Sequence, residues 1–193
     1  MMRTAPVVVC GLAALLIGQA VIGQAAGGGM DGLHHLAEQG NVQAQRRLGQ
    51  MYHDGQGVQR DYAQSMHWFR LAAAQGDAEA QNGVGTLYDN GKGVARDYQE
   101  AARWFRLAAD RGHVLARRNL GWMYEKGQGF AQDYVMAYKW QYLAEMARLA
   151  RQGDGSQEGV DRCRLCNALA RKMTADQVAR AKELARHWQP GDP

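Results

Sequence analysis

The sequence is poor in the residues that metal, redox and nucleophilic chemistry require. It holds three cysteines and six histidines among 193 residues, and no two histidines stand at the i, i+4 spacing of a helical metal site. No Ser-His-Asp set, paired-carboxylate motif or phosphate-binding loop stands out either. We therefore expect no catalytic residues, no cofactor and no metal.

Neither positive nor negative charge is in large excess. The formal net charge is +4, and residues 148–193 supply most of it with nine Lys or Arg against six Asp or Glu. The remaining 147 residues exceed neutrality by one charge, which is accounted for by Arg3. A nucleic-acid-binding protein needs basic residues clustered on one face, so we expect no nucleic-acid partner. The modest C-terminal excess is typical of a solvated helix face.

Long apolar runs are absent except at the N-terminus, where residues 6–22 are almost wholly apolar and Arg3 is the only preceding charge. Small residues follow at Gly23-Gln24-Ala25. This pattern predicts a secretory signal peptide over residues 1–25, and hence a secreted protein of the bacterial periplasm. The alternative is an uncleaved anchor that tethers the protein to the membrane, although two glycines and a glutamine inside the run weaken it.

Glycine, by contrast, is abundant and regularly placed. Half of the 24 glycines fall into four columns with a spacing of 36 residues. The columns are Gly40, Gly76 and Gly112; Gly49, Gly85 and Gly121; Gly55, Gly91 and Gly127; and Gly57, Gly93 and Gly129. A fixed period of this length indicates a solenoid in which each unit buries its apolar face against its neighbours. We predict a solenoid over residues 26–147, with repeats at about 40–75, 76–111 and 112–147, and a cap over residues 148–193.

Each unit reads as a pair of helices. Ala44, Leu48 and Tyr52 share one face of a first helix, helix A. Two glycines then end this helix. Asp61 is placed to cap a second helix, helix B, and Gln64 three residues later would complete a capping box; Asp97 and Glu100 repeat the pattern. The buried stripe of helix B is expected to comprise Ser65, Trp68, Phe69 and Ala72, and in the next copy Ala101, Trp104, Phe105 and Ala108.

One glycine column lies inside helix A, where glycine costs about 1 kcal/mol relative to alanine. Its members are Gly49, Gly85 and Gly121. Such a cost needs a steric reason, and close contact with a neighbouring helix supplies one.

Together, the patterns A-x3-LG-x-MY, G-x-G-V, D-Y-x3-A and W-x2-LAA resemble the Sel-1-like repeat family of secreted bacterial type, which is related to tetratricopeptide repeats. The resemblance implies an all-α fold, an α/α superhelical solenoid of antiparallel helix pairs whose A helices line a concave face. It also implies an adaptor or scaffold that binds a protein or peptide partner. Residues 32–39 would form the N-terminal cap. A helix over residues 157–172 and another from Thr174 to about Trp188 would form the C-terminal cap.

Cys163 and Cys166 are the only cysteines outside the predicted signal peptide. Two interpretations fit their positions. They are either two small apolar residues on a buried stripe with Val160, Ala170 and Met173, or the two halves of a local disulfide. A third interpretation is a redox, zinc or haem site, which would make the protein a cysteine-dependent envelope enzyme. The cysteine-rich relatives that resemble β-lactam-binding proteins carry a cysteine pair in each repeat, and this sequence carries none there.

The candidate binding face is the side of each A helix opposite its apolar stripe. The residues there vary between repeats while the stripe does not. The predicted binding residues are Arg46, Gln50, Asn82, Thr86, Leu115, Arg118 and Trp122. Exposed tryptophan and arginine anchor interfaces more often than other residues do. Trp122 therefore either anchors a partner or packs beneath the C-terminal cap.

Overall fold

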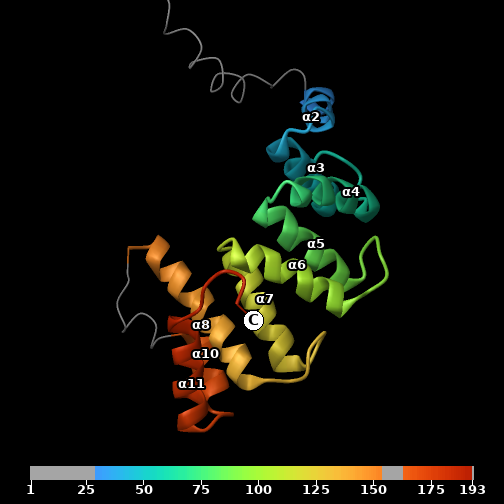
Figure 1. Ribbon diagram of the computed structural model, residues 1–193. Helices are drawn as coiled ribbons and strands as arrows, with labels where there is room; N and C mark the ends of the chain where they lie inside the picture. The colour runs from blue at the N-terminus through green and yellow to red at the C-terminus, as the bar shows by residue number, and fades with distance from the viewer. Residues whose placement is uncertain (1–28, 154–162, 193) are drawn as a thin grey trace, which may run out of the picture.

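The computed structural model describes residues 29–153 and 163–192, and all regular structure in these ranges is helical (Figure 1). The predicted signal peptide and Val160 lie outside the described residues. The helices are α2 (Gly29–Glu38), α3 (Val42–Asp54), α4 (Tyr62–Ala74), α5 (Ala78–Asn90), α6 (Tyr98–Asp110), α7 (Val114–Lys126), α8 (Tyr134–Arg151), α10 (Arg164–Ala170) and α11 (Ala175–Arg186).

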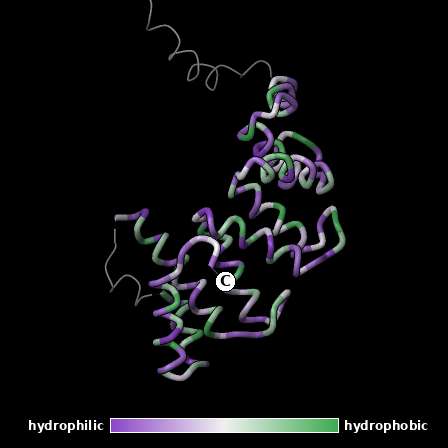
Figure 2. The backbone as a smooth tube through the Cα atoms, viewed as in Figure 1, coloured by the Kyte–Doolittle hydropathy of each residue, from purple (hydrophilic) through white to green (hydrophobic). Residues whose placement is uncertain are grey.

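From α2 to α8, each helix packs against the next one. Helices α3 and α4, α5 and α6, and α7 and α8 form the three A and B pairs, and α4 contacts α5 as α6 contacts α7. Apolar and polar residues alternate along every helix, as a stack buried on one side of each helix requires (Figure 2). The predicted all-α solenoid of helix pairs is confirmed.

The glycines after each A helix end it as predicted. Gly55 adopts a left-handed conformation with φ of 73°, and its backbone N–H donates to the carbonyl of Met51. Gly93, two residues beyond the equivalent stop, has a second constraint, because a Cβ there would lie 2.5 Å from the backbone oxygen of Tyr62. The loop of one repeat therefore packs on the first turn of the preceding B helix.

The aspartate caps form, but the predicted capping boxes do not. The Asp97 carboxylate accepts the N–H groups of Gln99 and Glu100 at 2.9 and 3.0 Å. A box would also need the Asp97 N–H, which instead donates to the Tyr88 carbonyl at 3.1 Å. The Asp61 N–H likewise donates to the carbonyl of Tyr52. The aspartate is therefore held from both sides, by its own helix and by the end of the helix before.

The glycines inside helix A are explained by close packing, because a larger side chain at these positions would collide with helix B. A Cβ at Gly49 would lie 2.5 Å from the ring of Phe69, and one at Gly85 would lie 2.7 Å from the ring of Phe105. Both rings are almost fully buried and cannot move aside. Helix B of each pair thus sits against a bare stretch of helix A backbone.

The tryptophan column is buried unevenly. Trp140 is fully buried and Trp68 is 6% exposed, whereas Trp104 is only half-buried, so its predicted place in a fully buried stripe is wrong. Other aromatic rings cover the outer two: His34 lies 5.5 Å from Trp68, and Trp188 lies 5.6 Å from Trp140. Within the described chain no ring stacks on Trp104.

A buried polar column that we did not predict joins each A helix to the preceding B helix. Gln45 Nε2 donates to the Ala37 carbonyl at 2.9 Å, and Gln81 Nε2 donates to the Ala73 carbonyl at 3.2 Å. In the third repeat Arg117 Nε takes over this role. The signal was present in the sequence as a polar residue that recurs every 36 positions beside the apolar stripe.

The C-terminal helices replace a fourth repeat. Helices α10 and α11 both pack on α8, and α10 begins at Arg164. Residues 157–162, with which the predicted first helix of the cap begins, lie outside the described residues. Lys172, just after α10, lies 5.6 Å above the ring of Tyr134, as Lys92 lies 5.0 Å above that of Tyr62. The predicted capping box at Thr174 is present.

Candidate binding surface

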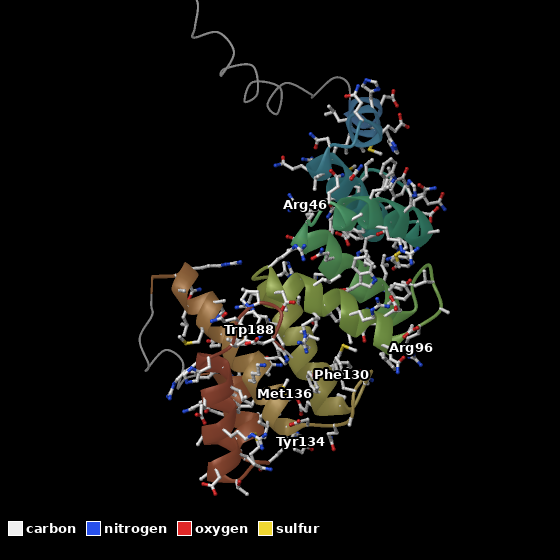
Figure 3. The ribbon with its side chains drawn as sticks, in the orientation of Figure 1. Arg46, Arg96, Phe130, Tyr134, Met136 and Trp188 are labelled. Carbon is white, nitrogen blue, oxygen red and sulfur yellow. A yellow bond between two sulfur atoms is a disulfide. The ribbon has the colours of Figure 1, made fainter. Side chains whose placement is uncertain are left out.

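In the first two repeats, some of the predicted face connects neighbouring A helices. Arg46 Nη1 lies 3.7 Å from Asp77, the N-cap of α5, and half-buried Asn82 accepts a hydrogen bond from Asn119 of α7 at 3.2 Å. Figure 3 shows Arg46 at the N-terminal end of the stack. Polar contacts of this kind fix the spacing of the A helices. Arg46 and Asn82 therefore hold the surface together as well as forming part of it.

Gln50 and Thr86 occupy the next column of the face. Gln50 is exposed and donates to Asp54 on its own helix. The Thr86 hydroxyl donates to the backbone carbonyl of Asn82 at 2.9 Å and is half-buried. Both side chains thus bond within their own helices, which limits their direct contribution to a partner.

The third repeat presents the apolar part of the face. Leu115 is 50% exposed and Trp122 is 42% exposed, although both are large apolar side chains. Arg118 is exposed between them on α7, at the i, i+3, i+7 spacing that places three residues on one helix side. The exposure of Trp122 favours a surface role over packing beneath the cap.

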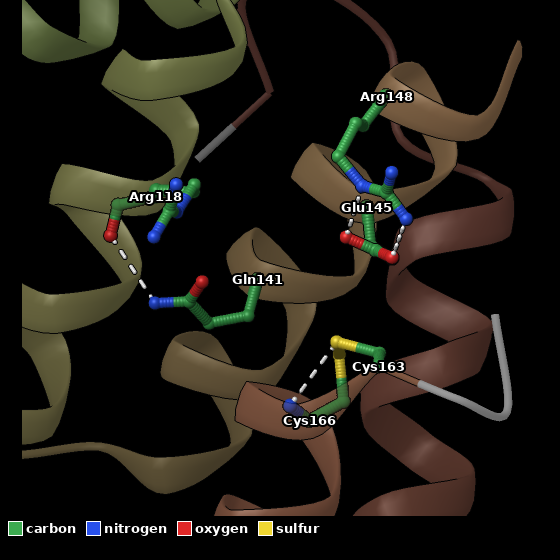
Figure 4. Close-up of a disulfide and its surroundings, with 6 residues drawn as sticks. All are labelled: Arg118, Gln141, Glu145, Arg148, Cys163 and Cys166. Carbon is green, nitrogen blue, oxygen red and sulfur yellow. Dashed lines mark hydrogen bonds and ion pairs between the residues drawn. A yellow bond between two sulfur atoms is a disulfide. The ribbon is translucent and has the colours of Figure 1, made fainter. Parts of the chain in front are cut away.

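Arg118 lies near polar and charged side chains of α8 (Figure 4). Arg148 pairs with Glu145 through bonds of 2.6 and 3.0 Å. This pairing lowers the pKa of the Glu145 carboxyl, and the charge of Arg118 lowers it further. Gln141, where the other repeats have phenylalanine, donates to the Arg118 carbonyl at 3.2 Å. The face at this end therefore places the Arg118 guanidinium beside polar groups of α8.

The two cysteines form a disulfide at the start of α10, with their Cα atoms 5.3 Å apart. Cys163 is 5% exposed and Cys166 is 1% exposed, and both belong to the core cluster of the third repeat. The Cys166 N–H also lies 3.2 Å from Cys163 Sγ. The pair is thus buried apolar packing and a local cross-link at once, and solvent barely reaches either sulfur.

Two partly buried titratable groups of the described chain lie on separate elements. Burial raises the pKa of the Asp89 carboxyl on α5, and burial lowers the pKa of His113, the N-cap residue of α7. Among the described residues, no three His, Cys, Asp or Glu side chains gather in a way that could hold a metal ion. In the same ranges, no helix has both the length and the apolar character that crossing a membrane demands.

Residues 42–77, 78–113 and 114–154 each match the Sel1 repeat. These matches cover more than half of the chain, so the protein belongs to the Sel1 repeat family. The matched residues include all three helix pairs, α3 to α8.

Two solved structures agree with this family. One is a protective antigen of uropathogenic Escherichia coli strains with an SLR fold: identity is 33%, the TM-score is 0.60, and the match covers 72% of this chain. This chain spans only 33% of that longer antigen. The other is a Sel1 repeat protein from Oxalobacter formigenes, with 34% identity, a TM-score of 0.55, and coverage of 69% of this chain and 96% of that one. No curated protein matches.

Proposed function

We propose that this Sel1 repeat protein is a scaffold of the bacterial envelope that binds a protein or peptide partner on its A-helix face. The observation that carries the proposal is the exposure of Leu115 and Trp122 on one side of α7. Large apolar side chains are costly to leave in water at adjacent positions, and they gain free energy when a partner covers them.

The position of Arg118 between these side chains supports the same conclusion. Tryptophan and arginine dominate the binding energy of many interfaces. Here the rigid α7 backbone presents both, and the neighbouring repeats hold that helix in place through α6 and α8. The predicted signal peptide supports an extracytoplasmic location for this binding.

The test is capture from an envelope extract with three purified proteins: wild type, the double variant Trp122→Ala with Arg118→Ala, and the control Gln43→Ala. Gln43 is exposed on the first A helix, away from the apolar patch. We expect the double variant to lose a specific partner that the control retains. A loss of about 2 kcal/mol per hot-spot residue corresponds to roughly thirtyfold in affinity for each.

Circular dichroism and thermal melting of the same samples separate binding from folding. The double variant should melt within a few degrees of wild type, because neither side chain is in the core. If it unfolds, Trp122 is a packing residue; if it stays folded and captures the same partner equally well, the partner uses another face.

A further inference from the structure

Residues 188–192, which follow α11, lie against the B helices α6 and α8 (Figures 1 and 3). Trp188 packs edge-on against Trp140 with ring centres 5.6 Å apart, and the Arg117 guanidinium lies 4.9 Å above the Trp188 ring. Four residues later, the Asp192 carbonyl accepts a hydrogen bond of 2.7 Å from Arg106. Residues 188–192 are thus a peptide ligand already seated on the repeat surface.

The α8 residues beneath this segment are buried. Trp140 is fully buried and Leu143, one turn further along α8, is 9% exposed. Both belong to the core cluster against which Trp188 packs. This surface of α6 and α8 is therefore covered within the chain itself.

The equivalent surface one repeat earlier, on α4 and α6, is more exposed. The residues 36 positions before Arg106, Trp140 and Leu143 are Arg70, Trp104 and Leu107. Their identities are the same, yet Arg70 is exposed, Trp104 is half-buried and Leu107 is 41% exposed.

Arg70 is also held in the same way as its counterpart. It donates to the hydroxyl of Tyr88, as Arg106 donates to that of Tyr124. Its guanidinium is thereby positioned by the next A helix and still has donors free for a carbonyl.

We infer that the surface formed by Arg70, Trp104 and Leu107 is a second binding site, for a short partner segment that carries a tryptophan followed, four residues on, by an accessible main-chain carbonyl. The chemistry of this ligand is that of residues 188–192, which pack on the equivalent surface of α6 and α8. The inference does not depend on the A-helix face, since its residues lie on the B helices.

The occupant is a separate protein, because the chain's own tail is committed elsewhere. The tail follows directly from α11, which packs on α8, so its effective concentration on the α6 and α8 surface far exceeds that of any free ligand. Two contacts of the α6 and α8 surface are not matched on α4 and α6. Gln81 stands where Arg117 stacks on Trp188. Arg106 lies 4.9 Å above the Trp140 ring, whereas Arg70 lies above the ring of Tyr88. The α4 and α6 surface should therefore bind such a segment more weakly, and Gln81→Arg should strengthen it.

The experiment measures fluorescence anisotropy of a labelled peptide, Arg-His-Trp-Gln-Pro-Gly-Asp, titrated with the full mature chain. We expect saturable binding that is lost when the peptide tryptophan is replaced by alanine. Arg70→Ala and Leu107→Ser should each weaken binding about tenfold or more, while Gln81→Arg should tighten it several-fold. The double variant at Arg118 and Trp122 should bind the peptide as wild type does, which separates this site from the A-helix face.

Three outcomes overturn the inference. The first is the absence of saturable binding. The second is binding that Arg70→Ala and Leu107→Ser, both shown to be folded by circular dichroism, leave unchanged, because the peptide then binds elsewhere or displaces the native tail. The third is self-association of the full chain in sedimentation experiments that Arg70→Ala abolishes, since the occupant would then be the tail of a second copy.

Discussion

The ring of His113 accepts the backbone N–H of Ala116 at 3.2 Å and so caps α7. Asn41 and Asp77 cap α3 and α5 from the same repeat position. Histidine can accept this bond only through an unprotonated Nδ1, so the cap requires the neutral ring. Burial lowers the pKa of His113, which favours that form, and the carboxylates of Glu79 and Asp77 oppose the shift only in part.

This cap should make stability depend on pH. The folded pKa of His113 lies below its ordinary value of 6.5, so the unfolded chain binds the proton more readily. The stabilisation by the neutral His113 cap is complete above about pH 6.5. It falls as the pH drops from about 6.5 through the folded pKa of His113. Urea unfolding at several pH values between about 7.5 and 5 checks this decline.

His113→Asn is the matched control, because asparagine caps α3 in the same position and does not titrate. The other histidines contribute equally to both proteins. The difference in unfolding free energy between wild type and His113→Asn should therefore shift against wild type as the pH falls. A difference that stays constant over this range would show that the ring does not act as a neutral cap.

Gly85→Ala should destabilise the protein by about 1–3 kcal/mol, as overpacking of a filled core does. A Cβ at this position would lie 2.7 Å from the buried ring of Phe105. Gly32→Ala is the control: a Cβ there meets nothing within 4 Å, so alanine should stabilise α2 by up to about 1 kcal/mol. Opposite shifts of the thermal midpoint are expected, and two shifts of the same sign would contradict the packing explanation.

Trp140→Ala should cost about 3–5 kcal/mol, as truncation of a fully buried tryptophan does. Trp104→Ala removes a half-buried ring and should cost at least about 1 kcal/mol less. Chemical denaturation of the two variants gives the comparison. Equal costs would mean that the C-terminal segment contributes nothing to the burial of Trp140.

Asp97→Ala should cost about 1 kcal/mol, because two N–H groups of α6 lose their acceptor. Glu100→Ala should change stability by less than about 0.5 kcal/mol, since Glu100 only pairs with exposed Arg103 and does not complete a capping box. Thermal melts distinguish the two. A Glu100→Ala cost as large as that of Asp97→Ala would restore the capping box.

Replacing Cys163 and Cys166 together by alanine should lower stability by about 2 kcal/mol, which is the loop entropy that so short a cross-link removes from the unfolded chain. Partner capture should remain, because both cysteines are buried and expose almost no surface to a partner. A folded double variant that captures nothing would assign the disulfide a functional role.

Most of the fold could be predicted because its determinants are local. Glycine stops such as Gly55 and caps such as Asp97 act within one or two turns, and their recurrence every 36 residues identifies the repeat. The seven-residue candidate binding set was drawn from the same register. Its helix faces could be assigned, but the contact between Asn82 and Asn119 could not, because it joins residues 37 positions apart.

Only the tertiary structure sets how deeply residues of the same type are buried at equivalent positions of different repeats. Trp104 and Trp140 have the same register and the same local sequence signal, yet one is half-buried and the other fully buried. The difference arises because Trp188 of the C-terminal segment packs on Trp140, whereas no ring packs on Trp104 in the described chain. The sequence by itself determined the unit and its helices; burial depends on what packs against each unit, and the 36-residue period carries no information about that.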